Sequence, residues 1–288
     1  MNKKDSKITQ KGVYDFFDYR QSGLPDANTL SGLGTAYKYN WLCKTIEALD
    51  FSNRPTKILD AGCGPGRIET IMNRDYKKLL DESDIFGIDI VDSLIEGCRE
   101  LRLPNCSFLV YDGKKIPFED DRFDVAFSVG VIEHVPDKVN YLNEIRRVLK
   151  PHGTLIISTP NPQCWGLNLS NHMYYGLRKL LRRKEICKDE FISLSSLSSL
   201  MKDSGFSFSG ETVHFLWPRV FVSIENRPLL PPLPAGLMLL YQRFCMFVML
   251  KCLYKQIPNF MKLRLFHTVA IVAKKIRLTE PIQETDRR

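Results

Sequence analysis

From about residue 57 onward, short apolar runs alternate with longer segments that place apolar residues at helical spacing. The apolar runs cover residues 57–61, 84–90, 107–111, 123–129 and 154–159. Segments with helical spacing lie between them, at residues 67–80, 92–101 and 138–149. The apolar runs lack the alternation of half-exposed strands, as expected when helices cover both faces of a sheet. Strands that alternate with helices of this length predict βαβ units, a mostly parallel sheet and an α/β fold.

The pattern is less regular at both ends of this alternation. A helix is predicted at residues 35–49. After residue 160, a helix is expected near residues 194–204, a strand near 206–213 and a last strand at 268–273. The expected organisation is a polar segment at residues 1–34, one α/β domain over 35–275 with insertions at 160–191 and 214–265, and a tail at 276–288.

The composition is that of a folded protein without a disulfide or zinc framework. Hydrophobic residues make up 44% of the 288 positions and charged residues 26%, which excludes a wholly disordered chain. None of the eight cysteines forms a CxxC pair, which favours a reduced, cytoplasmic protein. The N-terminus is polar, so no secretory signal is expected.

A glycine-rich loop follows the first predicted strand. The strand runs into Asp60, and glycines follow at positions 62, 64 and 66. They permit a tight turn and a close approach of another molecule, and the next helix offers free N–H groups. The dinucleotide fingerprint GxGxxG would need glycine where the chain has Arg67. An acid so close to the loop would repel a pyrophosphate but suits an ammonium and a sulfonium group, which disfavours a dinucleotide-dependent oxidoreductase.

Further acidic residues follow the next two strands. Asp89 ends the second strand, 23 residues after Gly66, and an acid at about this spacing typically binds ribose hydroxyls. Asp112 and Gly113 follow the third strand, where a carboxylate can accept a hydrogen bond from the exocyclic amine of adenine. Ligands of open α/β sheets bind outside the carboxyl ends of the strands, so these residues are expected to lie together.

The chain resembles the class I S-adenosylmethionine-dependent methyltransferases, and within them the subgroup that methylates quinone precursors, polysaccharides and lipids. The motifs that carry the resemblance are residues 58–66, Gly87-Ile88-Asp89, Asp112-Gly113, Ile116-Pro117-Phe118, Phe123-Asp124 and Ile132-Glu133-His134-Val135. The similarity is tight over residues 35–161 and loose over 190–275. It implies a Rossmann-like, seven-stranded, mostly parallel sheet with helices on both faces, an antiparallel last strand at 268–273, and helical insertions in the C-terminal half.

The resemblance also implies S-adenosylmethionine as the cofactor and assigns the residues that would hold it. These residues are Asp60, Gly62, Cys63, Gly64 and Gly66 for the methionine portion, Asp89 for the ribose, Ile90 for the adenine face, Asp112 with Gly113 for the adenine amine, and Ser128 and Val129 for the methyl-donor pocket. One departure is His152, which occupies a turn position where the family usually has glycine.

Methyl transfer from a sulfonium is an in-line displacement, in which the protein mainly aligns the reactants. A hydroxyl acceptor must also lose its proton, and histidine is the commonest base for that step. His134, beside Glu133 after the fourth strand, is the best placed of the five histidines, although a packing role at this turn is an equal alternative. Similar quinone methyltransferases build a metal site from this Glu-His pair and an earlier glutamate. The chain has Gly130 at that earlier position, so no required metal is expected.

The charge and the apolar segments of the C-terminal half indicate what kind of molecule accepts the methyl group. Residues 1–150 carry a net charge of −2 and residues 151–288 one of +10, which suggests an anionic partner for the second half. Two apolar segments with cationic faces, residues 172–184 and 237–254, favour peripheral attachment to the inner face of a membrane. Residues 237–254 fit a core or dimer-interface helix equally well.

An amphipathic or lipid-linked small-molecule acceptor is therefore expected, either a quinone precursor or a saccharide lipid. A soluble small-molecule acceptor, an RNA acceptor and a non-catalytic adenosylmethionine-binding protein stay open as alternatives. Nucleic acid is disfavoured because the sequence carries no appended RNA-binding motif.

Overall fold

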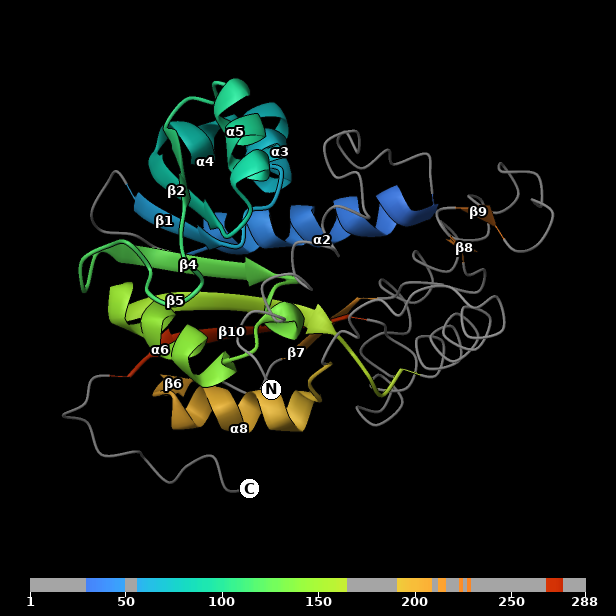
Figure 1. The fold of residues 1–288 in the computed structure, drawn as a ribbon, viewed down its shortest axis with the longest axis vertical. Helices are drawn as coiled ribbons and strands as arrows, with labels where there is room; N and C mark the ends of the chain where they lie inside the picture. The colour runs from blue at the N-terminus through green and yellow to red at the C-terminus, as the bar shows by residue number, and fades with distance from the viewer. Residues whose placement is uncertain are drawn as a thin grey trace.

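A computed structural model of the chain describes residues 30–49, 56–164, 191–208, 212–215, 223–224, 227–228 and 268–276. The main sheet contains β1 (Thr56–Ala61), β2 (Ser83–Asp89), β3 (Cys106–Val110), β4 (Phe123–Val129), β5 (Leu149–Pro160), β6 (Phe206–Ser207), β7 (Thr212–Phe215) and β10 (Thr268–Lys275). The strand order is β3-β2-β1-β4-β5-β10-β6, and β7 also pairs with β10 (Figure 1). A separate pair joins β8 (Ser223–Ile224) to β9 (Arg227–Pro228).

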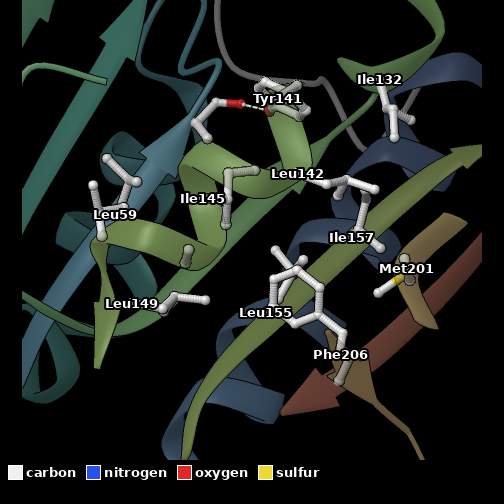
Figure 2. Close-up of a cluster of buried hydrophobic side chains, with 14 of the residues drawn as sticks. Leu59, Ile132, Tyr141, Leu142, Ile145, Leu149, Leu155, Ile157, Met201 and Phe206 are labelled. Carbon is white, nitrogen blue, oxygen red and sulfur yellow. Dashed lines mark hydrogen bonds between the residues drawn. The ribbon is translucent and has the colours of Figure 1, made fainter. Parts of the chain in front are cut away.

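Helices cover both faces of this sheet, as the apolar strands predict. They are α2 (Leu30–Glu47), α3 (Arg67–Asp75), α4 (Lys77–Asp81), α5 (Asp92–Glu100), α6 (Lys138–Val148) and α8 (Leu194–Asp203). On one face Ile58 and Ile85 pack under α2, α3 and α4, and α5 lies over β2 and β3 on the same side (Figure 1). On the other face Leu59 and Leu155 pack against α6 and α8 (Figure 2). Alternate residues of each strand are therefore buried in two separate cores.

The strands beyond β5, namely β10, β6 and β7, confirm the expected seven-stranded arrangement. Strands β1 to β5 pair in parallel, whereas β10 pairs antiparallel with β5, from Thr268 opposite Pro160 to Lys274 opposite Thr154. The strand predicted near residues 206–213 is divided into β6 and β7. These two pieces pair with opposite ends of β10 and together fill the seventh position.

The fifth strand begins earlier than its apolar run predicts. Leu149 already pairs with Phe123, and the register then shifts so that Thr154 pairs with Val125. The intervening residues form an irregularity in the strand rather than a separate turn. His152 lies there at a φ of +62°, a left-handed conformation that favours glycine, which accounts for the glycine usual at this position in the resembling family.

The helix predicted over residues 67–80 is two helices, because Tyr76 interrupts it with a φ of −131° and a ψ of 44°. The phenol of Tyr76 hydrogen-bonds to the carbonyl and side-chain oxygens of Asn40 in α2, each at 3.3 Å. The apolar stripe continues across the break, so Leu79 is still buried. The first predicted helix, residues 35–49, begins earlier in the structure, at Leu30.

Most of the two insertions expected in the C-terminal half lies outside the described residues, as do the apolar segments 172–184 and 237–254. Within the part of the chain that the structure describes, no helix combines the length and the apolarity that crossing a bilayer requires.

Side chains of α6 hold the loop that follows β3. Glu144 accepts a hydrogen bond from the backbone N–H of Ile116 at 2.9 Å. Arg147 donates to the carbonyls of Ile116 and Phe118 at 2.9 and 2.8 Å, and it pairs with Glu144 at 2.8 Å. An exposed carboxylate, Asp120, also contacts Arg147, at 2.7 Å. This clamp fixes the chain just after Asp112 and Gly113.

We predict that Arg147→Met lowers the free energy of unfolding by about 2–4 kcal/mol, because charged hydrogen bonds to the loop carbonyls are lost. Amide hydrogen exchange should rise over residues 112–122 at the same time. Asp120→Ala removes only a solvent-exposed ion pair and should cost less than about 1 kcal/mol. Urea denaturation of both variants checks this, and equal losses would contradict the clamp.

Candidate functional site

The predicted site residues gather at one edge because β1, β2, β3 and β4 are parallel and end there. Asp60 pairs with Gly87 in the ladder, and Asp89 pairs with Val110. Asp60 and Asp89 both belong to the face covered by α3 and α5, since they alternate with Leu59 and Ile88, which belong to the opposite core. The structure thus brings together the ends of the strands that carry the predicted motifs.

The glycine loop adopts a conformation that only glycine accommodates readily. Gly62 has a φ of +116°, and a Cβ at this position would overlap both methyl groups of Val131. The N–H groups of Gly62 and Cys63 both donate to the carbonyl of Ile88, at 2.9 and 3.0 Å. Gly64, at a φ of +52°, has open space where a side chain would be. The loop is therefore anchored at its start and open at its middle.

Asp89 ties the glycine loop to the end of β2. One carboxylate oxygen accepts from the N–H of Gly64 at 2.9 Å, and the other accepts from the N–H of Val91 at 3.0 Å. The side chain is 6% exposed, and burial raises its pKa against the lowering effect of these backbone hydrogen bonds. Each oxygen retains acceptor capacity beyond these bonds, as a ribose diol would require.

The expected adenine residues lie together beyond Asp89. Gly113 has a φ of +74°, and a Cβ there would come within 3.3 Å of a methyl group of Ile90. Asp112 is exposed, and one of its oxygens accepts from the N–H groups of Lys114 and Lys115 at 2.8 and 3.1 Å. These bonds lower the pKa of Asp112, so the carboxylate is charged and able to accept an amine hydrogen.

Asp60 and Glu69 form a feature that the sequence only partly revealed. Both side chains are buried, at 1% and 0% exposure, and none of their four oxygens has a hydrogen-bond donor among the described residues. Burial raises the pKa of each carboxyl group. Glu69 was missed, although it shares the buried stripe of α3 with Ile68 and Met72, which is the signal that could have found it. Two buried acids beside an open glycine loop suit a cationic group such as the ammonium end of adenosylmethionine.

The end of β4 is organised by Tyr141 of α6. Its phenol donates to the carbonyl of Ala61 at 2.6 Å (Figure 2). The same phenol lies 2.8 Å from the hydroxyl of Ser128. Ser128 is fully buried, so its hydroxyl is engaged beneath the loop, while Val129 is half-buried and pairs with Ser158. Tyr141 therefore links the glycine loop to the strand that precedes the candidate catalytic residues.

Glu133 and His134 lie on a short 3-10 helix, η1 (Ile132–His134). Glu133 is 5% exposed and accepts a hydrogen bond from the hydroxyl of Thr159 at 3.1 Å. Burial raises its pKa, and the charges of His134 and Lys38 oppose that shift. His134 is half-buried beside it. Lys38, from α2, is a further residue of this corner that sequence reasoning missed.

Among the described residues, no group of three or more histidine, cysteine, aspartate or glutamate side chains has the arrangement of a metal site. A Cβ at Gly130 would lie 3.5 Å from a carboxylate oxygen of Glu133, so that carboxylate faces the position where similar enzymes carry their additional acid. The expectation that the reaction needs no metal stays a prediction.

Comparisons with known proteins agree with this geometry. A model described as a methyltransferase domain matches residues 52–203. A 2-methyl-6-phytyl-1,4-hydroquinone methyltransferase of Synechocystis is 35% identical over 37% of this chain and 32% of its own length. A probable tRNA methyltransferase 9B of Homo sapiens is 28% identical over 54% of this chain, again 32% of its own. The matched segment thus spans about a third of both relatives.

A demethylmenaquinone methyltransferase of Thermotoga maritima is 25% identical over 74% of this chain and 96% of its own length. Among solved structures, a putative sarcosine dimethylglycine methyltransferase from Galdieria sulphuraria superposes with a TM-score of 0.56. The two are 17% identical, and the superposition covers 94% of this chain and 98% of that one. This likeness shows that the two chains share a fold.

We predict that Gly62→Ala destabilises the protein by about 3 kcal/mol or more, because strain at a positive φ adds to overlap with Val131. Gly64→Ala is the matched control, since a methyl group there meets only open space, and it should cost about 1–2 kcal/mol. Denaturant titration of both variants measures the difference. A loss for Gly62→Ala no larger than that for Gly64→Ala would mean that the loop does not hold the described conformation.

Proposed function

The chain belongs to the class I S-adenosylmethionine-dependent methyltransferases, and we propose that it transfers the methyl group to a hydroxyl of an amphipathic, quinol-type molecule. The observation that carries the cofactor site is the Asp89 carboxylate, which holds the N–H of Gly64 and so joins the glycine loop to β2. Asp89 ends β2, between Asp60 of the neighbouring β1 and the contact of Ile90 with Gly113. Amino-acid, ribose and adenine portions of the cofactor can follow this order along the edge.

When bound, the cofactor supplies an electrophilic methyl group on a sulfonium. The protein's part is to align an acceptor with that methyl group and to remove the acceptor's proton. His134 lies beside Glu133 at the carboxyl end of β4, and its imidazole is the group proposed to take the proton. Glu133 is fixed by Thr159 and would stabilise the imidazolium that forms. Lys38 adds a cation to the same corner, which would favour the anionic form of a quinol oxygen.

The acceptor class is supported by the relatives and by the charge distribution. Two relatives are named as methyltransferases of a phytyl hydroquinone and of demethylmenaquinone, which supports a quinone or quinol ring as the acceptor class but does not name the acceptor atom. The +10 net charge of residues 151–288 and the apolar segment at 237–254 suit a substrate that resides in an anionic membrane. We propose peripheral attachment to the inner membrane face on this basis.

An RNA acceptor is the second candidate. It is favoured by the probable tRNA methyltransferase among the relatives and by the same cationic half of the chain. A buried, apolar-flanked Glu133 beside the candidate base favours a compact phenolic acceptor over a splayed nucleotide, which usually stacks on aromatic side chains.

We predict that saturation with S-adenosylhomocysteine at about 100 times its Kd raises the Tm by roughly 5–10 °C, because the ligand binds only the folded state. Asp89→Asn should abolish most of this shift, since one acceptor oxygen becomes an amide donor. The control Asp92→Asn alters an exposed acid at the start of α5 and should leave the shift intact. NAD should produce no shift, and a shift with NAD that Asp89→Asn removes would refute the assignment.

We predict that the purified protein labels a prenylated, demethylated quinol in membrane vesicles from radiolabelled adenosylmethionine, and leaves bulk tRNA unlabelled. His134→Ala should lower turnover by roughly 10²–10⁴-fold at unchanged cofactor affinity. His152→Gly is the control histidine variant, because His152 is exposed at the other end of β5. Labelling of tRNA alone would favour the second candidate, and full activity of His134→Ala would leave His134 a packing residue.

A further inference from the structure

The two peptide groups that flank the Cα of Gly64 are held by different elements of the fold. The N–H of Gly64 donates to the carboxylate of Asp89, at the end of β2, at 2.9 Å. The carbonyl of Gly64 accepts a hydrogen bond from the thiol of Cys98, in α5, at 3.2 Å. The thiol of Cys63 approaches the same oxygen at 3.8 Å. The middle of the glycine loop is thus fixed by β2 through its N–H and by α5 through its carbonyl.

The sequence leaves the peptide after Gly64 a single polar group. The next residue is Pro65, whose ring nitrogen carries no hydrogen, so this peptide can be held by hydrogen bonding only through the Gly64 carbonyl. Gly64 itself has a φ of +52°, and a Cβ there would meet nothing within 4 Å in the described part of the chain. Side-chain packing therefore does not restrain Gly64, and the thiol of Cys98 supplies the restraint.

Helix α5 comes close enough to the loop for this bond because Gly66 has no side chain. A Cβ at Gly66 would lie within 3.1 Å of the sulfur of Cys98 and 3.2 Å of a methyl group of Leu101. Cys98 is fully buried, in a small apolar cluster with Ile95 and Phe108. A thiol suits this position, because it packs as a small apolar group and can still donate one weak hydrogen bond.

The start of α5 is attached to the same carboxylate that holds the loop. Asp89 accepts a hydrogen bond from the N–H of Val91, the residue before α5, at 3.0 Å. The path from Asp89 along α5 to Cys98 therefore returns to Gly64 and closes a ring of contacts around the loop. Rotation of either peptide that flanks Gly64 has to break one of these bonds.

We propose that Cys98 is a positioning residue for the cofactor, which holds the peptide between Gly64 and Pro65 in its binding conformation before the cofactor arrives. The proposal rests on the methyltransferase function above, since it takes the glycine loop as the site of the methionine portion. Cys98 acts through the loop, because its buried side chain has no surface to offer to a ligand. A loop that is already ordered in the free protein loses less conformational entropy on binding, so the bond raises the affinity for the cofactor.

Three substitutions separate the hydrogen bond from the packing of the side chain. Cys98→Ser keeps a donor, Cys98→Val keeps an apolar side chain without a donor, and Cys98→Ala removes both. Isothermal titration calorimetry of the full chain with S-adenosylhomocysteine should give a Kd within about twofold of wild type for the serine variant. The Kd of the other two should be about three- to tenfold weaker, as expected for the loss of one hydrogen bond.

Cys43→Ala is the matched control. Cys43 is as fully buried as Cys98, but it lies in α2 and packs in a different apolar cluster. Its replacement by alanine should lower the midpoint of urea unfolding, as Cys98→Ala does, and leave the Kd for S-adenosylhomocysteine unchanged. An equal loss of affinity in both alanine variants, or a Kd for Cys98→Ser as weak as that for Cys98→Ala, would reduce Cys98 to a packing residue.

Amide hydrogen exchange of the free protein gives a readout that needs no ligand. The amides of Gly64 and Gly66 should exchange faster in Cys98→Val and Cys98→Ala than in the wild type and Cys98→Ser, while the amides of β10 stay as protected as before. Faster exchange with an unchanged Kd would overturn the proposal, because the restraint would then not serve the cofactor. A wild-type protein that shows these exchange differences but binds no S-adenosylhomocysteine would instead refute the cofactor site on which the proposal rests.

Discussion

The carboxylate of Asp89 joins the glycine loop to the end of β2, beyond the last paired residues of β1 and β2. Its hydrogen bond to Gly64 sets the height of the glycine loop above β1, and its bond to Val91 starts the turn into α5. The loop can donate this bond because Gly62 and Gly64 adopt positive φ values, which turn the chain so that the N–H of Gly64 reaches Asp89. Without the bridge, the N–H of Gly64 would lose its acceptor, and only the start of the loop would remain anchored, by the bonds of Gly62 and Cys63 to Ile88.

Burial, more than charge, determines the chemistry of this edge. The sheet is apolar on both faces, so acids at the strand ends border two dry cores. Asp60, Glu69 and Glu133 are all buried, and burial raises the pKa of each. Asp112 lies outside the cores and has a lowered pKa. One edge thus holds carboxyl groups whose pKa is raised by burial beside one whose pKa is lowered by backbone hydrogen bonds.

The central fold followed from the sequence because periodicity and glycine placement are local signals. The apolar runs predict β1 to β4 closely, and the glycine spacing predicts the loop. The break at Tyr76 was not foreseen, because it depends on a contact with Asn40 in a helix distant along the chain. The early start of β5 depends on pairing of Leu149 with Phe123, which no local pattern encodes.

Glu69 was missed because a glutamate in the first turn of a helix is usually interpreted as a favourable charge at the helix end. Lys38 was missed because only the placement of α2 brings it near Glu133.

Amide NMR of the full chain, titrated with S-adenosylhomocysteine, locates the cofactor most directly. If the edge organised by Asp89 is the binding site, the largest changes will fall on the amides of residues 62–66, 89–91 and 112–114. Two other hollows offer a clear contrast: about 440 Å³ beside Lys138, Phe191 and Ser193, and about 310 Å³ beside Cys98, Arg102 and Phe108. Changes confined to either hollow, with the glycine loop unaffected, would contradict the account.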